Sequence, residues 1–113
     1  MNTKILGGLG EAHAENYLKK NGYKILERNY RTKIGEIDLI TEKDEIVVFV
    51  EVKARVNTKF GQPKEAVNFH KQFKIRKVAE EYLLRTKRLK SKTSFDVVEF
   101  IPPDKINHLK NCF

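Results

Sequence analysis

The hydrophobic and polar positions along the chain predict two helices. The first is expected over about residues 9–20, where Lys19 and Lys20 precede Gly22, a usual way for a helix to end. The second is expected from residue 69 to about residue 87, because Asn68 suits the N-cap position. Each helix has apolar residues at helical spacing: Ala14, Tyr17 and Leu18 in the first, and Ile75, Val78, Ala79, Tyr82 and Leu83 in the second.

The remaining apolar segments predict strands. Their expected ranges are residues 23–30, 36–42, 45–54, 94–101 and, as an edge strand, 106–113. The 45–54 segment is apolar on both faces for most of its length, which is typical of a central strand covered on both faces. A loop with Gly61 and Pro63 follows it. This order of elements predicts one α/β (α+β) domain over residues 1–113, a sandwich of helices around a mixed sheet.

Charge then narrows the class of partner. The 113 residues include 23 Lys and Arg against 15 Asp and Glu, a net charge of +8. A small domain this basic is attracted to polyanions, either nucleic acid or an anionic membrane surface. No apolar stretch is long enough to span a bilayer, no signal peptide is recognisable, and the single cysteine, Cys112, forms no internal disulfide. We therefore expect a cytoplasmic protein without a membrane partner.

The second and third predicted strands form a hairpin. With residues 43–44 as its two-residue turn, Asp38 lies opposite Phe49, and Glu36 lies opposite Glu51. Asp38 and Glu51 are then diagonal neighbours, roughly 7–8 Å apart at the backbone. Side chains of this length can span that distance.

Charged residues collect on one face of this hairpin, because residues two positions apart in a strand share a face. That face carries Glu36, Asp38, Glu51 and Lys53. The opposite face is apolar and is expected to belong to the core; it carries Ile37, Leu39, Ile46, Val48, Val50 and Val52.

Neighbouring carboxylates on a central strand repel one another and lose hydration. A hard divalent cation with oxygen ligands would balance them, and it would also polarise a phosphoryl oxygen and acidify a bound water. Lys53 could then position that water or neutralise charge on the phosphate. The alternative is that Glu51 and Lys53 form only a solvated ion pair at the edge of the sheet, and the spacing alone leaves both interpretations open.

Three longer strings of residues resemble a known superfamily. They are GEAHAENYL on the first helix, GEIDLI at residues 35–40 and FVEVKAR at residues 49–55. Together they resemble the PD-(D/E)XK nucleases, and within these the YraN-like bacterial family; the layout is also similar to that of archaeal Holliday-junction resolvases. The resemblance covers about residues 10–101 and departs from the pattern at Ile37, where the superfamily's name has a proline.

The resemblance implies a restriction-endonuclease-like fold and an endonuclease that cuts DNA with Mg²⁺ or Mn²⁺. It implies that Asp38, Glu51 and the Val52 carbonyl are metal ligands and that Lys53 is the catalytic lysine. Glu11 matches an acidic position that completes the metal shell. From the sequence, Glu11 could equally be a first-turn acid that interacts with the helix dipole, and Glu36 could support the site or pair with a nearby arginine.

Gln72 is expected to face inward from the second helix. The resemblance implies that it touches the substrate or the active-site water, and the alternative is an amide that caps a backbone carbonyl. Basic residues around the acids are expected to hold the nucleic-acid backbone; the candidates are Arg31, Lys33, Arg55, Lys71, Lys74 and Lys77.

Branched, flapped or damaged DNA is the expected substrate, with RNA left open, and a homodimer is possible because paired cuts need two sites. Two alternatives remain open: a catalytically silent nucleic-acid-binding module that keeps the nuclease fold, and a basic assembly protein with structural acids. His13, His70 and His108 share no ligand spacing and are predicted to be incidental.

Overall fold

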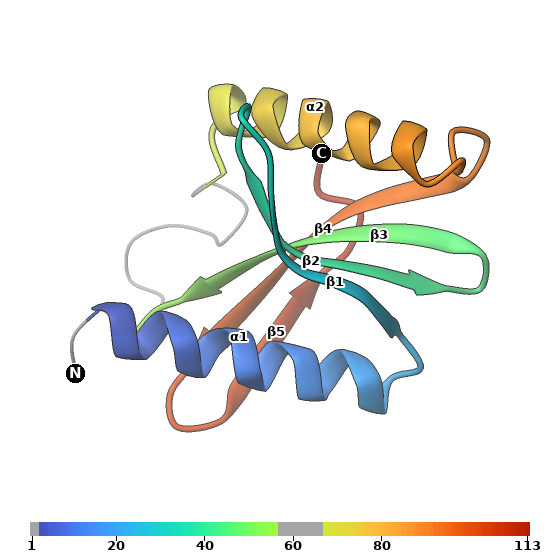
Figure 1. Ribbon diagram of the computed structural model, residues 1–113. Helices are drawn as coiled ribbons and strands as arrows, with labels where there is room; N and C mark the ends of the chain where they lie inside the picture. The colour runs from blue at the N-terminus through green and yellow to red at the C-terminus, as the bar shows by residue number, and fades with distance from the viewer. Residues whose placement is uncertain (1–2, 57–66) are drawn as a thin grey trace.

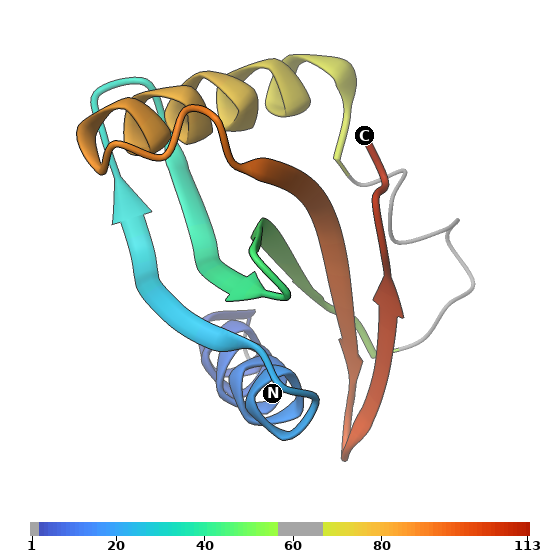
Figure 2. The same ribbon diagram turned by 90° about the vertical axis from the view of Figure 1, so that its right-hand side faces the viewer.

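The strands form one mixed sheet between two helices (Figures 1 and 2). The computed structural model describes residues 3–56 and 67–113. Its elements are α1 (Thr3–Lys20), β1 (Lys24–Arg31), β2 (Glu36–Lys43), β3 (Ile46–Ala54), α2 (Phe69–Arg85), β4 (Lys92–Ile101) and β5 (Lys105–Leu109).

The strand order in the sheet is β1-β2-β3-β4-β5. β3 and β4 are parallel, and the other neighbouring strands are antiparallel. Parallel strands need a crossover connection, and α2 lies within the connection from β3 to β4. The mixed sheet and the central position of the third strand are therefore confirmed.

Each helix covers one face of the sheet (Figure 1). On the α2 side, Val47 and Phe49 pack in a cluster with Tyr82. On the α1 side, Val48 and Val50 pack in a second cluster with Leu18. The alternation along β3 thus supplies both cores, as its nearly continuous apolar sequence predicts.

The face predicted to be purely apolar is mostly confirmed. Leu39, Val48 and Val50 are buried beneath α1, and Ile46 and Val52 pack against the same cluster. Ile37 is the exception, because it belongs to the cluster on the α2 side. It lies near the start of β2, beyond the part of that strand that pairs with β3.

The β2–β3 turn lies one residue later than predicted. Lys43 pairs with Ile46, so Asp44 and Glu45 form the turn, with φ of 51° and 66°. Positive φ at both central residues is the conformation that suits a two-residue hairpin. Lys43 remains in the strand, where its ammonium lies 4.9 Å from the centroid of the Tyr23 ring. A one-residue error in the turn changes every partner by two positions but leaves the face assignments unchanged.

α1 begins at Thr3, six residues earlier than the predicted residue 9. The glycines near its start weaken the helical signal, but one of them is needed for packing. A Cβ built at Gly10 would lie 3.0 Å from the Cβ of Ala54 and 3.6 Å from Phe100, so α1 crosses β3 and β4 at close range.

The other boundaries differ by a few residues at most, and the C-terminal edge strand is shorter than predicted. The loop expected around Gly61 and Pro63 lies outside the described residues. Within residues 3–56 and 67–113, neither helix is long and apolar enough to cross a membrane.

Asn68 caps α2 as predicted, because its side chain accepts a hydrogen bond of 2.9 Å from the backbone N–H of Lys71. We expect Asn68→Ala to lower the free energy of unfolding by about 1 kcal/mol, or Tm by roughly 4 °C. Asn68→Ser, which restores an acceptor, should recover most of the loss. Thermal unfolding by circular dichroism measures both; equal losses in the two variants would show that the cap contributes little.

Candidate active site

The candidate site lies where β2 and β3 separate, a place we call the fork. The two strands pair from Lys43 and Ile46 as far as Leu39 and Val50, and the ladder then ends. Beyond it, β2 leads back to the β1–β2 turn beside the N-terminal half of α2, whereas β3 continues toward the start of α1 (Figure 1). Backbone groups just past the fork therefore lose their partners in the neighbouring strand.

Two carboxylates accept hydrogen bonds from these backbone groups. The Val52 N–H donates to Asp38 Oδ2 at 2.8 Å. The backbone N–H of Asp38 in turn bonds to the carboxylate of Glu51. Phe49 pairs with Ile40, so the predicted pairing of Asp38 with Phe49 is wrong by two residues.

Two lysines lie near this acidic pair, and one of them contacts it. Lys71 Nζ, from the first turn of α2, lies 3.5 Å from Glu51 Oε2. Lys53 is half-buried two residues after Glu51, and its side chain lies within hydrogen-bonding distance of Lys71. The sequence predicted Lys53 at the site and assigned Lys71 to contacts with nucleic acid. The structure brings Lys71 to Glu51 from the first turn of α2, which Asn68 caps.

Burial and mutual repulsion act on both acids. Burial raises the pKa of Glu51 to about 7, and the Asp38 charge adds to that rise, while Lys71 and Lys53 oppose it. Burial also raises the pKa of Asp38. Glu51 is only 5 % exposed, so water does little to stabilise its ionised form. The two lysines compensate these carboxylates only in part.

The pKa values of the two lysines shift in opposite directions. Burial lowers the pKa of Lys53, and the adjacent Lys71 lowers it further. At Lys71, burial acts to lower the pKa, but the contact with Lys53 and the negative charges of Glu51 and Asp38 outweigh it and raise the pKa. Of the two, Lys71 therefore holds its proton more firmly and balances Glu51.

Glu11 extends the negative charge onto α1. It is half-buried, and its pKa is raised by burial and then by repulsion from Asp38 and Glu36. Because α1 begins at Thr3, the interpretation of Glu11 as a first-turn acid is wrong. Glu36 pairs with an arginine, since Arg31 Nε donates to Glu36 Oε2 at 2.7 Å.

Gln72 does not point its amide at the acids. Its Nε2 donates to the Val67 carbonyl at 2.8 Å, which agrees with the capping alternative. Arg55 is bound to Glu99: Arg55 Nη2 lies 2.7 Å from Glu99 Oε2, and the two side chains are 18 % and 1 % exposed. Asn107 Nδ2 donates to the other oxygen of Glu99 at 2.8 Å. Arg55 thus belongs to a buried polar network that sequence reasoning missed.

The remaining predicted basic contacts are exposed. Lys33 lies in the β1–β2 turn, and Lys74 and Lys77 lie on the solvent side of α2. A Cβ built at Gly35 would lie 3.8 Å from the Cβ of Lys74, so this turn packs against α2. Cations from two elements therefore border one side of the fork, together with exposed Arg31.

The donors at the fork fit a hard cation. Asp38 and Glu51 supply carboxylate oxygens, and the adjacent Val52 supplies a backbone carbonyl, which are the ligand types preferred by Mg²⁺ and Mn²⁺. Among the described residues, no three His, Cys, Asp or Glu side chains are grouped closely enough to hold a metal ion. In this conformation Glu11 therefore contributes charge near Asp38 but no third side-chain ligand.

A second buried polar network includes His108, which the sequence predicted to be incidental. His108 Nε2 lies 2.7 Å from Asp96 Oδ2, and Tyr17 OH lies 3.0 Å from His108 Nδ1. Ser94 Oγ donates to Asp96 Oδ1 at 2.6 Å. The network connects α1, β4 and β5, so the prediction for His108 is wrong. No short-range spacing could reveal contacts between residues so far apart in the chain.

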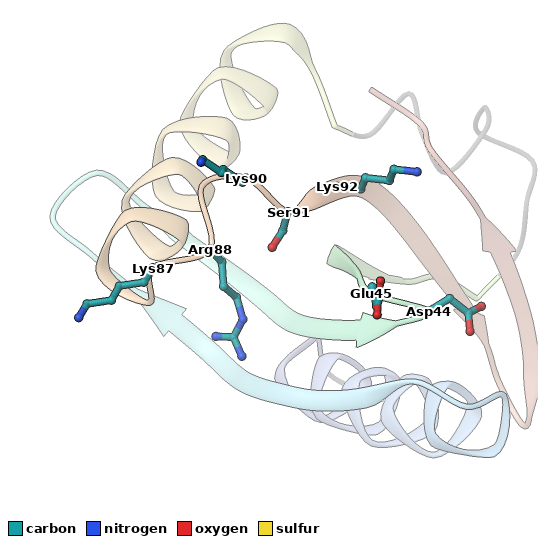
Figure 3. Close-up of a pocket in the computed structure, with 7 residues that line it drawn as sticks. All are labelled: Asp44, Glu45, Lys87, Arg88, Lys90, Ser91 and Lys92. Carbon is teal, nitrogen blue, oxygen red and sulfur yellow. The ribbon is translucent and has the colours of Figure 1, made fainter.

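A hollow of about 440 Å³ lies between the β2–β3 turn and the connection from α2 to β4 (Figure 3). It is lined by Asp44, Glu45, Lys87, Arg88, Lys90, Ser91 and Lys92. The three lysine side chains point in different directions, so they form no convergent set (Figure 3). The hollow shares no residue with the fork.

Comparison with known proteins identifies the family. The model of a family described as uncharacterised protein family UPF0102 matches residues 10–100. The chain belongs to the UPF0102 family. This YraN-like family falls within the PD-(D/E)XK nuclease-like superfamily, so the resemblance of the sequence strings is confirmed. The matched range includes Glu11, the whole fork and α2.

Three UPF0102 relatives match over nearly their full lengths. The protein of Syntrophomonas wolfei is 51% identical over 98% of this chain and 99% of its own. That of Clostridioides difficile is 47% identical over 100% of both chains. That of Caldanaerobacter subterraneus is 46% identical over 100% of this chain and 98% of its own. These UPF0102 names state no activity.

The raised pKa of Glu51 predicts a pH-dependent stability. An acid whose pKa is about 7 when folded, against about 4.3 when unfolded, destabilises the fold progressively as pH rises between those values. We expect Glu51→Gln to unfold at nearly the wild-type temperature at pH 4 and to be more stable at pH 8, by on the order of 2 kcal/mol. Thermal unfolding without divalent metal measures this difference.

Glu81→Gln is the matched control, because Glu81 is an exposed acid on α2. Its stability relative to wild type should not change with pH. If the stability of Glu51→Gln relative to wild type changed with pH no more than that of Glu81→Gln, Glu51 would ionise as a solvated group.

Proposed function

We propose that this protein is a metal-dependent endonuclease that hydrolyses phosphodiester bonds in DNA. The observation that carries the proposal is the fork, where Asp38 and Glu51 are held together by backbone hydrogen bonds and contacted by Lys71. Membership of a nuclease-like superfamily supports it. Surface acids with no function are not usually placed where burial raises their pKa.

In the proposed reaction, Asp38, Glu51 and the Val52 carbonyl would hold Mg²⁺ or Mn²⁺, and Glu11 would add negative charge from α1. When bound, such a cation polarises a phosphoryl oxygen and lowers the pKa of an attacking water. Lys53 projects from the same face as Glu51 and orients that water or neutralises charge on the phosphate. Lys71 is added to the predicted site as a second cation at Glu51, where it limits repulsion between the acids and the substrate.

Net charge supports a nucleic-acid substrate. The chain carries +8 overall. The exposed Arg31, Lys33 and Lys74 lie around the β1–β2 turn on one side of the fork, and Lys77 is exposed farther along α2. A basic border attracts the phosphates that the central acids would repel. Recognition through backbone and shape suits branched, flapped or damaged DNA, and a homodimer would allow two strands to be cut symmetrically.

One observation favours a second candidate, a nucleic-acid-binding module without catalysis. Lys71 Nζ lies 3.5 Å from Glu51, and Lys53 lies beside it. Two ammonium groups could balance two carboxylates with no metal. The candidates differ in their response to divalent cations, which only the nuclease requires.

Metal binding is tested by its effect on stability. At a metal concentration about 100 times the Kd, mass action stabilises the folded state by about 2.7 kcal/mol. For a domain of this size the Tm should rise by roughly 10 °C. We expect Mn²⁺ to produce such a rise in the wild type and Asp38→Asn to abolish most of it, as measured by thermal unfolding with and without metal.

Asp44→Asn is the control, because Asp44 is an exposed acid in the β2–β3 turn. It should keep the wild-type response. Equal metal-induced shifts in all three proteins would place the cation elsewhere, and no shift in any of them would favour the binding module.

The role of Lys53 is tested on a panel of labelled branched, flapped, single-stranded and duplex substrates with Mn²⁺. On any substrate that the wild type cuts, Lys53→Ala should reduce cleavage by at least 100-fold. The metal-induced rise in Tm should remain, since the proposed ligands are intact. Lys53→Arg should restore little, because a planar guanidinium does not replace a compact ammonium.

Lys90→Ala is the control for loss of one exposed positive charge far from the fork. It should cleave at nearly the wild-type rate. Wild-type cleavage by Lys53→Ala would remove the central residue of the proposed mechanism.

A further inference from the structure

Two large aromatic side chains lie exposed on the outer face of α2. Phe69 is 87 % exposed and Phe73 is 56 % exposed. They are four residues apart, so they lie one helical turn apart on the same face. The buried residues of α2 lie on the opposite face, against the sheet: Ile75, Val78, Ala79, Tyr82 and Leu83.

Single exposed apolar residues are common on protein surfaces, but this pair is interleaved with positive charge. Lys77 continues the row one turn later, and its Nζ lies 5.6 Å from the centroid of the Phe73 ring. Lys74 is exposed beside Phe73. Neither phenylalanine belongs to either hydrophobic core cluster among the described residues.

We propose that Phe69 and Phe73 form a stacking platform for unpaired bases of single-stranded DNA. Exposed aromatic rings among cations are the arrangement by which proteins bind single strands without reading sequence, because every base has a face that can stack and every nucleotide has a phosphate. A purely apolar partner surface would leave the neighbouring cations without compensation, whereas a nucleic-acid strand supplies bases and phosphates together. The choice of DNA rests on the proposed nuclease function.

The platform and the fork lie on different faces of one helix. Lys71, which contacts Glu51, lies between Phe69 and Phe73 in the chain, but two residues correspond to about 200° around a helix. A strand joining the two places must pass around a helix roughly 10 Å in diameter. Half the circumference of such a helix is roughly 16 Å, so at about 3.4 Å per stacked nucleotide this path requires about five unpaired nucleotides. The substrate class is therefore DNA with a single-stranded segment, such as a flap or a gap, rather than blunt duplex.

The test measures binding to labelled DNA in EDTA, so that it does not depend on cleavage. A single strand of about 20 nucleotides, longer than the site of one small single-strand-binding domain, is compared with a blunt duplex and with an abasic strand that has the same phosphates. Phe69→Ala/Phe73→Ala should bind the single strand about 10- to 100-fold more weakly, since each stacked base contributes roughly 5- to 150-fold. Its affinities for duplex and abasic strand should change less than twofold.

Two further variants distinguish ring stacking from a general apolar contact. Phe69→Tyr/Phe73→Tyr keeps the rings and should bind like the wild type, whereas Phe69→Leu/Phe73→Leu keeps apolar character and should bind like the alanine variant. Leu84→Ala is the matched control, because Leu84 is 64 % exposed on the same helix and should have no effect. Because all these positions are exposed, unchanged circular dichroism is expected.

The stacking assignment is wrong if the leucine variant binds like the wild type, or if the alanine variant loses duplex and single-strand affinity equally. It is also wrong if the phenylalanines instead hold two copies of this chain together, which would appear as a dimer that the alanine variant dissociates. Tighter binding of an RNA strand of the same sequence would overturn DNA as the occupant. Selective loss of single-strand binding, in a protein that cuts nothing on the panel, would support the platform and reject the nuclease.

Discussion

The separation of β2 from β3 is the constraint on which the candidate site depends. A sheet that splits leaves backbone N–H groups without strand partners, and such groups are costly to bury unpaired. Here the Asp38 carboxylate accepts from Val52, and Glu51 accepts from Asp38. An ionised carboxylate has about four acceptor positions, so one backbone bond fixes its orientation and leaves most of its capacity free. The hydrogen bonds that complete the fold thus also hold two acids in position.

The two helices then set the charge around those acids. α2 brings Lys71 to Glu51, and the Asn68 cap fixes the first turn from which Lys71 extends. α1 brings Glu11 into the field of Asp38. Burial raises the pKa of all three acids, so ionising them costs more than ionising exposed acids. Such a site gains more than an exposed one from a cation, because each uncompensated charge is poorly solvated.

Much of the fold follows from local pattern. The apolar run in β3 predicted a central strand, and the alternation around it assigned Asp38, Glu51 and Lys53 to one face. Which face a residue takes depends only on whether its position is odd or even. The face assignment is therefore correct, although the turn lies at Asp44 and Glu45, one residue later than predicted. The pairing of Asp38 did not survive, because register depends on the position of the turn itself.

Other parts of the site depend on packing between distant segments. Lys71 is 20 residues beyond Glu51, and which lysine of a basic helix reaches the fork depends on where that helix is docked. Arg55 looked like one more surface cation until β4 placed buried Glu99 beside it. His108 shares no spacing with Asp96 or Tyr17, and only the neighbouring strands and α1 bring them together. No short window of sequence contains these distances.

The close approach at Gly10 gives α1 a second role. Its Cα lies so near β3 that an added Cβ would come within 3.0 Å of Ala54, and the next residue in the chain is Glu11. The depth at which the helix sits therefore sets the separation between the Glu11 charge and Asp38. A larger residue at position 10 would lift the helix and weaken that repulsion while leaving every group at the fork chemically unchanged. The missing side chain of a glycine thus acts as a spacer that adjusts the acidity of the neighbouring Glu11 through its distance from a carboxylate on another element.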